Sequence, residues 1–321
     1  MNKRFTSSYL AGGLTKVLTW ASGGAASKQT VFQGFWHGRP LSPVLIACLR
    51  SFIKRGHAFH LYAYEELNVP DGVTLKSASD VLPAEDIFLF RNPETDEPDI
   101  CPFSDLFRFK LLLTSGGWWS DVDCICLSEN IPQFRRAWAR ENPEWNPGAV
   151  GTSQIAFQKS DPIVRELFDR CLALSRAKLA RREVTGPHLM SATIRDLGMP
   201  LDMGGTPDLF YPVRWIEMFK LWLPEFHEEV AAKAKKAYFM PIYQSFPLYI
   251  GLNRVKLPPK GSFLDDICRQ FAPEFTGADR HTVDEIFAGT KSFFERKSDW
   301  AIGELVAVSG LDVLERFGLK Q

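Results

Sequence analysis

The stretch SDLFRFKLLLTSGGWWSDVDCICL, residues 104–127, joins a helix-like half to a strand-like half through two glycines. Ser104 can accept a hydrogen bond from a free amide of the first helical turn, so we expect it at the N-cap. The apolar residues of 106–113 continue the helix, and Gly116-Gly117 ends it. The chain is then expected to run extended from Trp118 to Leu127. A helix that leads directly into a buried strand is typical of an α/β fold.

The upstream sequence supports the same fold class. VFQGFWHG (31–38) has the side chains of a strand, and AFHLYAY (58–64) has those of a second one. Between them a helix is expected from Ser42 to Arg55, because Pro43 suits a first helical turn and Gly56 follows the last. Strand, helix and strand form the beginning of a βαβ unit. After residue 131 the pattern is mainly helical, and the last forty residues resemble short amphipathic helices.

The charge balance excludes one class of partner. The 321 residues carry 38 lysines and arginines and 38 aspartates and glutamates. A neutral chain lacks the electrostatic footprint of a nucleic-acid binder, so no nucleic-acid partner is expected. The basic runs Arg181-Arg182 and Lys233 to Lys236 are interpreted as solvated helix faces, although they could also provide a basic patch at a membrane.

Cysteine usage and hydropathy indicate the compartment. The six cysteines form no CxxC pair and no Cys/His spacing suited to zinc, so we interpret them as reduced. Reduced cysteines favour the cytoplasm. No run of 18 apolar residues occurs, so no spanning helix is expected. Any membrane attachment should therefore be peripheral, on the inner face of the membrane.

Asp121 and Asp123 are the first candidates for chemistry. Side chains alternate along an extended segment, so both carboxylates should point to one face while Val122 and Cys124 point to the other. Two carboxylates about 7 Å apart suit a hard divalent ion, which completes its shell with phosphate oxygens and water. An Asp-x-Asp triplet is common by chance, so the motif alone indicates little.

Two further residue pairs lie in the same stretch. Asp105 and Arg108 are spaced i, i+3 and share one face of the predicted helix. They form either an exposed ion pair or a polar pair that reaches into a site, and the spacing leaves both interpretations open. Trp118-Trp119 beside the acids is better interpreted as core filling for at least one ring.

In this arrangement the chain resembles a known family. Ser104-Asp105, Arg108, the Leu-rich helix, Gly116-Gly117 and Asp121-Val122-Asp123 stand in the order of the sugar-binding region of the DXD glycosyltransferases. That family includes bacterial capsule and lipopolysaccharide enzymes, the yeast initiating α-mannosyltransferase and the glucosylating toxins. TGPHLMSATIRDLGM (185–199) and FYPVRW (210–215) are similar to two later segments of the family.

The resemblance implies a GT-A-type nucleotide-sugar-binding fold with a mixed, mostly parallel sheet flanked by helices. It also implies a division of the chain. Residues 1–30 would be a poorly determined leader, and residues 31–265 the glycosyltransferase domain. Within that domain, 31–130 would bind the donor and 131–265 the acceptor, with a closing loop. Residues 266–321 would add C-terminal helices.

The resemblance further implies residue roles and an activity. Asp123 would ligate Mn²⁺ or Mg²⁺, and Asp121 would bind ribose or a metal-bound water. Asp105 and Arg108 would hold hydroxyls of the donor sugar, and Trp36 would stack on the nucleotide base. The activity would be retaining transfer of a sugar from a nucleotide-sugar donor, UDP-linked or GDP-mannose, to a surface-polysaccharide or glycolipid acceptor.

One departure from the family is visible near the C-terminal end. Many bacterial relatives carry a histidine there that completes the metal shell, whereas this chain has Tyr243, Gln244 and Ser245. The third protein ligand could be an oxygen of Gln244 or Ser245, or it could be water. Two alternative functions remain for the same residues: a metal-dependent phosphohydrolase that acts on nucleotide-sugars, and a non-catalytic glycan-binding protein. A sugar-nucleotidyltransferase should carry a Gly-rich loop after its first strand, which this chain lacks.

Overall fold

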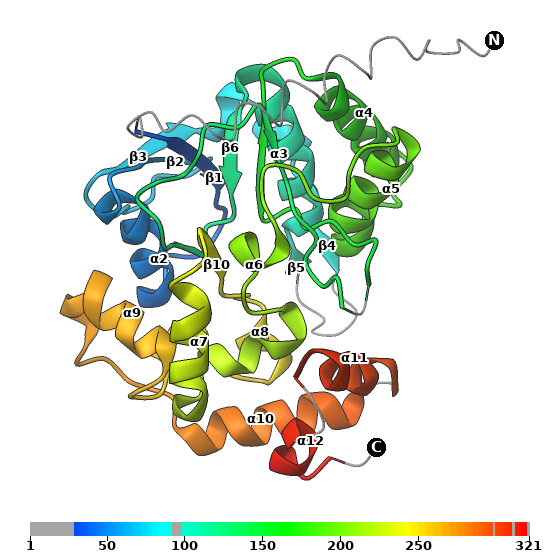
Figure 1. The fold of residues 1–321 in the computed structure, drawn as a ribbon. Helices are drawn as coiled ribbons and strands as arrows, with labels where there is room; N and C mark the ends of the chain where they lie inside the picture. The colour runs from blue at the N-terminus through cyan, green and yellow to red at the C-terminus, as the bar shows by residue number, and fades with distance from the viewer. Residues whose placement is uncertain (1–28, 92–97, 145, 298, 310–311, 320–321) are drawn as a thin grey trace.

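The computed structural model describes residues 29–91, 98–144, 146–297, 299–309 and 312–319 (Figure 1). The predicted leader, residues 1–30, falls almost entirely outside this part of the chain.

A six-stranded sheet organises the structure, with strand order β3-β2-β1-β6-β9-β8. The pairs β1–β2, β2–β3 and β1–β6 are parallel, and β9 is antiparallel to both of its neighbours, β6 and β8. The predicted α/β class with a mixed, mostly parallel sheet is therefore confirmed. Its strands are β1 Val31–Phe35, β2 Ala58–Ala63, β3 Val73–Ser77, β6 Gly117–Ser120, β8 Arg136–Ala137 and β9 Gln154–Phe157.

The first βαβ unit forms as its sequence predicts. Helix α2, Pro43–Lys54, lies between β1 and β2, and the Ser42 side chain accepts a hydrogen bond from the Leu45 amide at its start. Gly56 follows the helix with φ +79°, in the left-handed region that favours glycine. The short connections on either side of α2 keep β1 and β2 adjacent and parallel, as a crossover helix requires.

Helix α3, Cys101–Ser115, begins four residues earlier than predicted, with Ile100 at its N-cap. Ser104 lies inside the helix, so its assignment as the N-cap is wrong. The Asp99 carboxylate instead accepts a hydrogen bond from the Cys101 amide, 2.9 Å away. The predicted end is confirmed, because Gly116 and Gly117 both have positive φ and a Cβ on Gly116 would lie 2.3 Å from the Lys159 amide nitrogen.

The acidic segment after β6 differs from the single extended strand that we predicted. A turn interrupts it over residues 121–123, and the next strand, β7 Cys124–Cys126, pairs with β10 Phe239–Pro241 in a separate antiparallel sheet. The backbone partner changes within the turn: Asp121 donates its amide to Ser153, while Asp123 accepts from the Ile242 amide. The Asp-x-Asp segment thus connects two sheets.

The prediction of a mainly helical chain after residue 131 is wrong for three strands, namely β10 and the two main-sheet strands β8 and β9. β8 and β9 complete the edge of the main sheet beyond β6, and all four residues of β9 are buried, so exposed and buried positions do not alternate along it. Such short buried runs carry no periodic signal. The remaining short elements are β4 Phe90–Arg91, β5 Pro98–Asp99, α6 Pro207–Phe210, α8 Phe246–Tyr249, the irregular turn η3 Val184–His188 and the 3-10 turns η1 Ala78–Asp80, η2 Ala84–Asp86, η4 Trp215–Leu221, η5 Pro224–Phe226 and η6 Pro273–Phe275.

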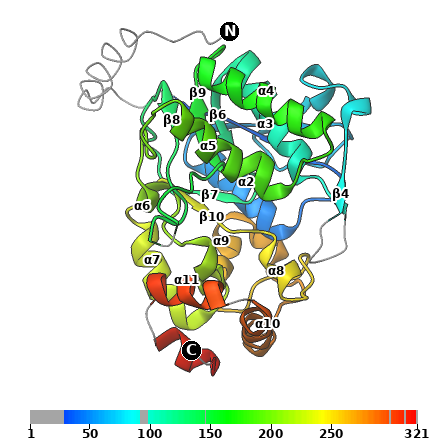
Figure 2. The same cartoon turned by 90° about the vertical axis from the view of Figure 1, so that its right-hand side faces the viewer.

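Helices cover both faces of the main sheet (Figures 1 and 2). On one face α3 packs with α4 Pro162–Arg176 and α5 Leu189–Asp196. On the other face lies α2, and α9 Phe263–Phe271 packs against α2. Successive side chains of β6 point into the two cores on opposite faces of the sheet, because Trp118 belongs to one core and Trp119 to the other.

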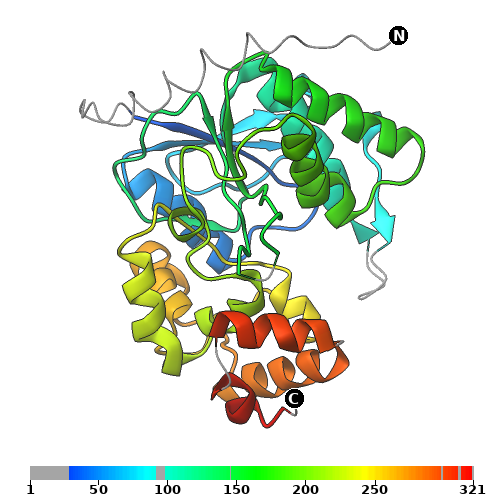
Figure 3. The same cartoon turned by 45° about the vertical axis from the view of Figure 1, so that its right-hand side comes forward.

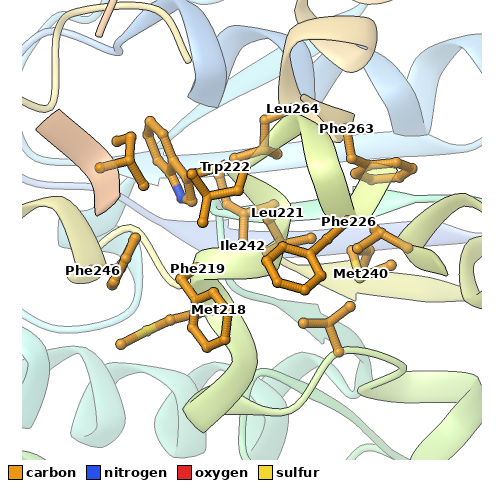
Figure 4. Close-up of a cluster of buried hydrophobic side chains, with 14 of the residues drawn as sticks. Met218, Phe219, Leu221, Trp222, Phe226, Met240, Ile242, Phe246, Phe263 and Leu264 are labelled. Atoms are coloured by element: carbon orange, nitrogen blue, oxygen red, sulfur yellow. The ribbon is translucent and has the colours of Figure 1, made fainter. Parts of the chain in front are cut away.

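A third core lies beneath β7 and β10 and joins the C-terminal helices to the sheet (Figures 3 and 4). Trp222 lies at its centre, with Ile242 and Phe246 from either side of the turn after β10. The predicted boundary at 265/266 falls inside α9, where buried Asp265 pairs with Arg280. The helices of this region are α7 His227–Ala234, α10 Val283–Arg296, α11 Asp299–Ser309 and α12 Asp312–Phe317. No helix among the described residues is long and apolar enough to cross a membrane.

Candidate functional site

The carboxyl ends of three strands meet at one edge of the main sheet. β1 and β6 are parallel, and β6 and β8 have the same direction because both are antiparallel to β9. Trp36 therefore follows β1, Asp121 follows β6, and Glu141 lies shortly after β8, all at the same edge. Ligands of open α/β sheets bind at this kind of edge.

Asp121 is held in one orientation by two donors. Its Oδ1 accepts hydrogen bonds from Arg108 Nη2 at 3.0 Å and from the indole nitrogen of Trp119 at 2.7 Å. The Arg108 guanidinium also lies over the Trp119 ring, 4.8 Å from its centroid. The Asp121 side chain is 30% exposed, and its Oδ2 has no hydrogen-bond partner among the described residues. One oxygen is thus anchored while the other remains available.

Asp105 and Arg108 form a buried pair behind Asp121. They are 4% and 5% exposed, and Arg108 Nη1 lies 3.1 Å from Asp105 Oδ1. Thr185 donates its hydroxyl to Asp105 Oδ2 at 2.9 Å. A Cβ on the next residue, Gly186, would lie 3.0 Å from the same oxygen, so the glycine lets the chain approach Asp105. The two motifs singled out in the sequence therefore contact each other.

Asp123 is bound to the turn that follows β10. Its Oδ2 accepts the Gln244 amide at 2.8 Å, and its carbonyl oxygen accepts the Ile242 amide. The Gln244 side chain is 8% exposed, and its Oε1 has no hydrogen-bond partner. Ser245 lies next to it, half-buried, at the start of α8. An unsatisfied buried oxygen is costly, so this atom is a candidate ligand contact.

Tyr243 gives this turn a strained backbone. Its φ is +51°, which is uncommon for a residue with a bulky side chain. The Tyr243 hydroxyl donates to the Val213 carbonyl oxygen at 3.1 Å, and the neighbouring Ile242 and Phe246 lie in the core around Trp222. Such conformations persist where the surroundings fix them and are concentrated at functional sites.

Trp36 lies at the end of β1, half-buried rather than inside the core. Its backbone amide donates to Tyr62 and its indole nitrogen donates to the Arg39 carbonyl oxygen at 2.6 Å. These bonds fix the ring at the carboxyl edge, with part of its surface open.

The site holds more negative than positive charge. Burial raises the pKa of Asp123 to about 6, and the charge of Asp121 adds to the rise. Burial also raises the pKa of Asp105 to about 7, although Arg108 acts in the opposite direction. The pKa of Asp121 is raised for the same first reason. Ionised carboxylates are therefore disfavoured here unless a cation joins them.

We expect this electrostatic strain to appear as a pH-dependent effect of Asp123→Asn. A carboxyl whose folded-state pKa is raised stabilises the protein fully below the unfolded-state pKa and loses that contribution as the pH rises through about 6. In chelator, the variant should therefore melt at a higher temperature than wild type at pH 8, and this difference should be smaller at pH 5 and should vanish only near the unfolded-state pKa of 3.8. His57 and His60 titrate in both proteins and cancel in this difference. A variant that is less stable than wild type at pH 8 would contradict the prediction.

Two residues near this edge, Glu141 and Arg182, are not among the site residues that the sequence predicts. Glu141 follows a strand that the helical interpretation had hidden, and burial raises its pKa to about 7 with the Asp121 charge as the next cause. Arg182 donates two hydrogen bonds to Asp99, and its charge lowers the pKa of Asp105, Asp121 and Asp123. The prediction of a solvated face for Arg181-Arg182 is wrong for Arg182, whose guanidinium is bound to Asp99. The position of Arg182 three residues before Thr185 was the one available signal.

The oxygens that remain available fit a hard divalent cation. Asp121 Oδ2, the second oxygen of Asp123 and Gln244 Oε1 have no hydrogen-bond partner among the described residues. Carboxylate and amide oxygens are the ligands that Mn²⁺ and Mg²⁺ accept, with water and phosphate for the other positions. Within the described ranges, no three His, Cys, Asp or Glu side chains gather closely enough to hold one ion. The chain itself would thus supply few ligands.

Comparisons with known proteins find similarity to solved structures. No protein-family model matches the chain, and no curated protein matches its sequence. Among solved structures, the chain is similar to one described as "PaToxG Glycosyltransferase", with a TM-score of 0.40 and 18% identity. The alignment covers 53% of this chain and 69% of that one. A likeness of this extent does not decide the function.

Proposed function

We propose that this chain is a metal-dependent glycosyltransferase that uses a nucleotide-sugar donor. The observation that carries the proposal is the position of Asp121 and Asp123 at the carboxyl edge of the sheet, each with one oxygen held and one available. Beside them lies the unsatisfied oxygen of Gln244, and further along the edge lies the Trp36 ring. An acidic pair with an adjacent aromatic ring suits a nucleoside diphosphate bound through a divalent cation.

Each residue then has a role. Asp121 and Asp123, with Gln244, would hold Mn²⁺ or Mg²⁺. Bound there, the ion would supply Lewis-acid stabilisation of the charge that develops on the departing nucleoside diphosphate. Ser245 lies within the same turn and would contact the donor.

Asp105 and Arg108 act on the donor through Asp121 in this proposal. Both are nearly fully buried, and the guanidinium is already engaged by two carboxylates. Direct contact with sugar hydroxyls, which the family resemblance implies, would require the pair to be reached from the site. The structure supports a positioning role better, in which Arg108 fixes the orientation of Asp121.

The donor, acceptor and stereochemistry follow from the resemblance and belong to the proposal. A UDP-sugar is favoured and GDP-mannose is the second choice, with retention of the anomeric configuration. The acceptor would be a surface polysaccharide or a glycolipid, reached by a cytoplasmic protein with at most peripheral attachment to the membrane. The alternatives are a phosphohydrolase that acts on nucleotide-sugars and a non-catalytic glycan-binding protein.

A nucleotide-sugar panel tests the proposed function. The chain is mixed with UDP- and GDP-linked sugars with Mn²⁺, with Mg²⁺ and with chelator, and both the melting temperature and the release of nucleotide are measured. We expect stabilisation and slow hydrolysis that require the metal, and release of intact sugar and nucleoside diphosphate. Products cleaved within the diphosphate would identify a phosphohydrolase. Stabilisation by glycans without any donor turnover would identify a binding protein.

Replacement of Trp36 tests the proposed base-stacking surface. Stacking of a base on an aromatic ring contributes about 1–3 kcal/mol, so Trp36→Ala should weaken UDP binding in Mn²⁺ by about tenfold or more, while Trp36→Phe should retain most of the affinity. Calorimetric titration of folded variants measures the effect. Unchanged affinity in Trp36→Ala would show that the ring only covers the end of β1.

A further inference from the structure

A basic cavity lies at the end of the β7–β10 sheet that is farther from the acidic pair. It is open, has a volume of about 340 Å³, and is lined by residues 127–130 after β7, by residues 235–238 before β10 and by Arg55 at the C-cap of α2. Asp123 directly precedes β7, so four residues of nearly extended chain, about 13 Å, separate it from Leu127. The basic cavity and the proposed donor site are therefore distinct.

The cavity has more cations than carboxylates. The charged residues that line it are Arg55, Glu129, Lys235 and Lys236. Lys235 and Lys236 are exposed, and neither pairs with a carboxylate among the described residues. Lys233, on the preceding turn of α7, is by contrast paired with Glu217 at 3.3 Å. The charges of the two cavity lysines are thus available to a ligand.

Arg55 also has hydrogen-bond donors that are not used. Its Nη1 lies 3.5 Å from Glu129 Oε1, and the Glu129 side chain is 65% exposed, so water screens this pair. The Nε of Arg55 is buried and has no hydrogen-bond partner among the described residues. An unsatisfied buried donor is costly. The guanidinium between α2 and the 127–130 loop is therefore incompletely paired.

The ends of two helices do not account for these cations. α2 ends at Lys54 and α7 at Ala234, so the partial negative charges of both helix ends lie near the cavity. Each helix already has a basic residue in its last turn, Lys54 in α2 and Lys233 in α7. The three cavity cations exceed the one carboxylate and the charge of about −1 that the two helix ends contribute together. A net positive charge therefore remains in the cavity.

We propose that the basic cavity binds a phosphate-bearing anion. Arginine recognises phosphate through its planar fork, and lysine does so as a point charge. The side-chain amide of Asn130 lines the same cavity and can donate to a further phosphate oxygen. A volume of about 340 Å³ lies at the lower end of the range for small-molecule sites, so the cavity admits a phosphate group with a small substituent. Such a group can belong to a lipid headgroup or to a phosphorylated compound in solution.

Calorimetric titration of the full chain with pyrophosphate, in the presence of chelator, tests this proposal. Without a divalent ion the acidic pair of the donor site repels an anion, so binding reports on the basic cavity. We expect saturable binding that the double variant Lys235→Gln/Lys236→Gln weakens by about tenfold or more, because two unit charges beside the ligand are lost. Arg55→Gln should weaken the binding as well, through the loss of the fork.

A second double variant, Lys159→Gln/Lys260→Gln, is the matched control. It removes two exposed lysines that do not line the cavity, so the net charge of the chain changes by the same amount. Its affinity for pyrophosphate should equal that of wild type. An equal loss of affinity in both double variants would overturn the proposal, because the anion would then respond to the overall charge of the protein.

Cosedimentation with phosphatidylcholine vesicles, with and without phosphatidic acid, identifies the source of the phosphate. Binding to the acidic vesicles that Lys235→Gln/Lys236→Gln loses would identify a lipid headgroup, and binding to pyrophosphate alone would identify a compound in solution. Either result supports the site. The proposal is overturned if neither pyrophosphate nor acidic vesicles bind, or if that double variant binds as wild type does. None of these outcomes depends on nucleotide-sugar turnover, so the proposed function is tested separately.

Discussion

Asp123→Asn is expected to lower turnover of the nucleotide-sugar by about 100- to 1,000-fold, the loss seen when one preorganised electrostatic contact to a developing charge is removed. The amide can still accept the Gln244 amide, so the turn after β10 should keep its place. What is lost is the ligand charge. A diphosphate beside two ionised carboxylates is repelled unless a cation intervenes, so chelator should abolish wild-type activity, and Mn²⁺ should restore it.

Asp161→Asn is the matched control for this experiment. Asp161 caps α4 through the Ile163 amide and pairs with Arg136, beyond the end of β9 that faces away from the site. Asparagine caps a helix about as well as aspartate, so this variant should retain full activity. The measurement is turnover with and without metal in wild type and both variants. Full activity of Asp123→Asn, or of wild type in excess chelator, would remove the basis of the proposed function.

The sequence predicts most strongly where several local signals agree. Around α2, the capping serine, the proline in the first turn and the terminal glycine all indicate one helix, and the structure confirms it within a residue at each end. Gly116-Gly117 likewise ends α3 because the packing against Lys159 leaves no room for a Cβ at Gly116. These features depend on contacts within or next to the segment itself, so they can be inferred without knowledge of the tertiary structure.

The signals fail where a distant segment determines the local structure. β9 is four residues long and buried, and it forms a strand because β6 and β8 pair with it from both sides. The turn at 121–123 exists because β7 pairs with β10, more than a hundred residues away. Alternation along a strand predicted that Val122 is buried and the two aspartates are not, which is correct although the segment is a turn. The predicted directions of these side chains are therefore correct, although the predicted backbone conformation is not.

In the candidate site, too, only the locally determined features could be predicted. Asp121 and Asp123 could be identified because they lie in one short stretch of sequence. Glu141 could not be identified, because its position depends on the pairing of β8 with β9. Gln244 was considered for its position near the C-terminal element, but only the structure shows that its amide holds Asp123 and that its side-chain oxygen is unsatisfied. Burial likewise could not be inferred for Asp105 and Arg108, since i, i+3 spacing is equally compatible with an exposed ion pair.

That burial leads to a large expected effect of Arg108→Gln. Removal of one partner from a buried ion pair leaves an uncompensated charge and costs about 3–5 kcal/mol. Here two carboxylates, Asp105 and Asp121, lose their counterion. The free energy of unfolding, measured in urea, should fall by about this amount in the metal-free protein, and turnover should fall because Asp121 loses the donor that orients it. Adding Asp105→Asn to the variant should restore part of the stability, because one uncompensated charge is then removed.

Arg170→Gln provides the comparison for this prediction. Arg170 also contacts two carboxylates, Glu166 and Asp196, but it is 34% exposed on α4. Exposed ion pairs contribute about 0–1 kcal/mol, so its removal should change the free energy of unfolding little. If Arg108→Gln instead lost activity while its free energy of unfolding stayed within about 1 kcal/mol of wild type, the guanidinium would not stabilise the fold from within. It would then act on the donor directly, as the family resemblance implies, and the buried pair would have to open when the donor binds.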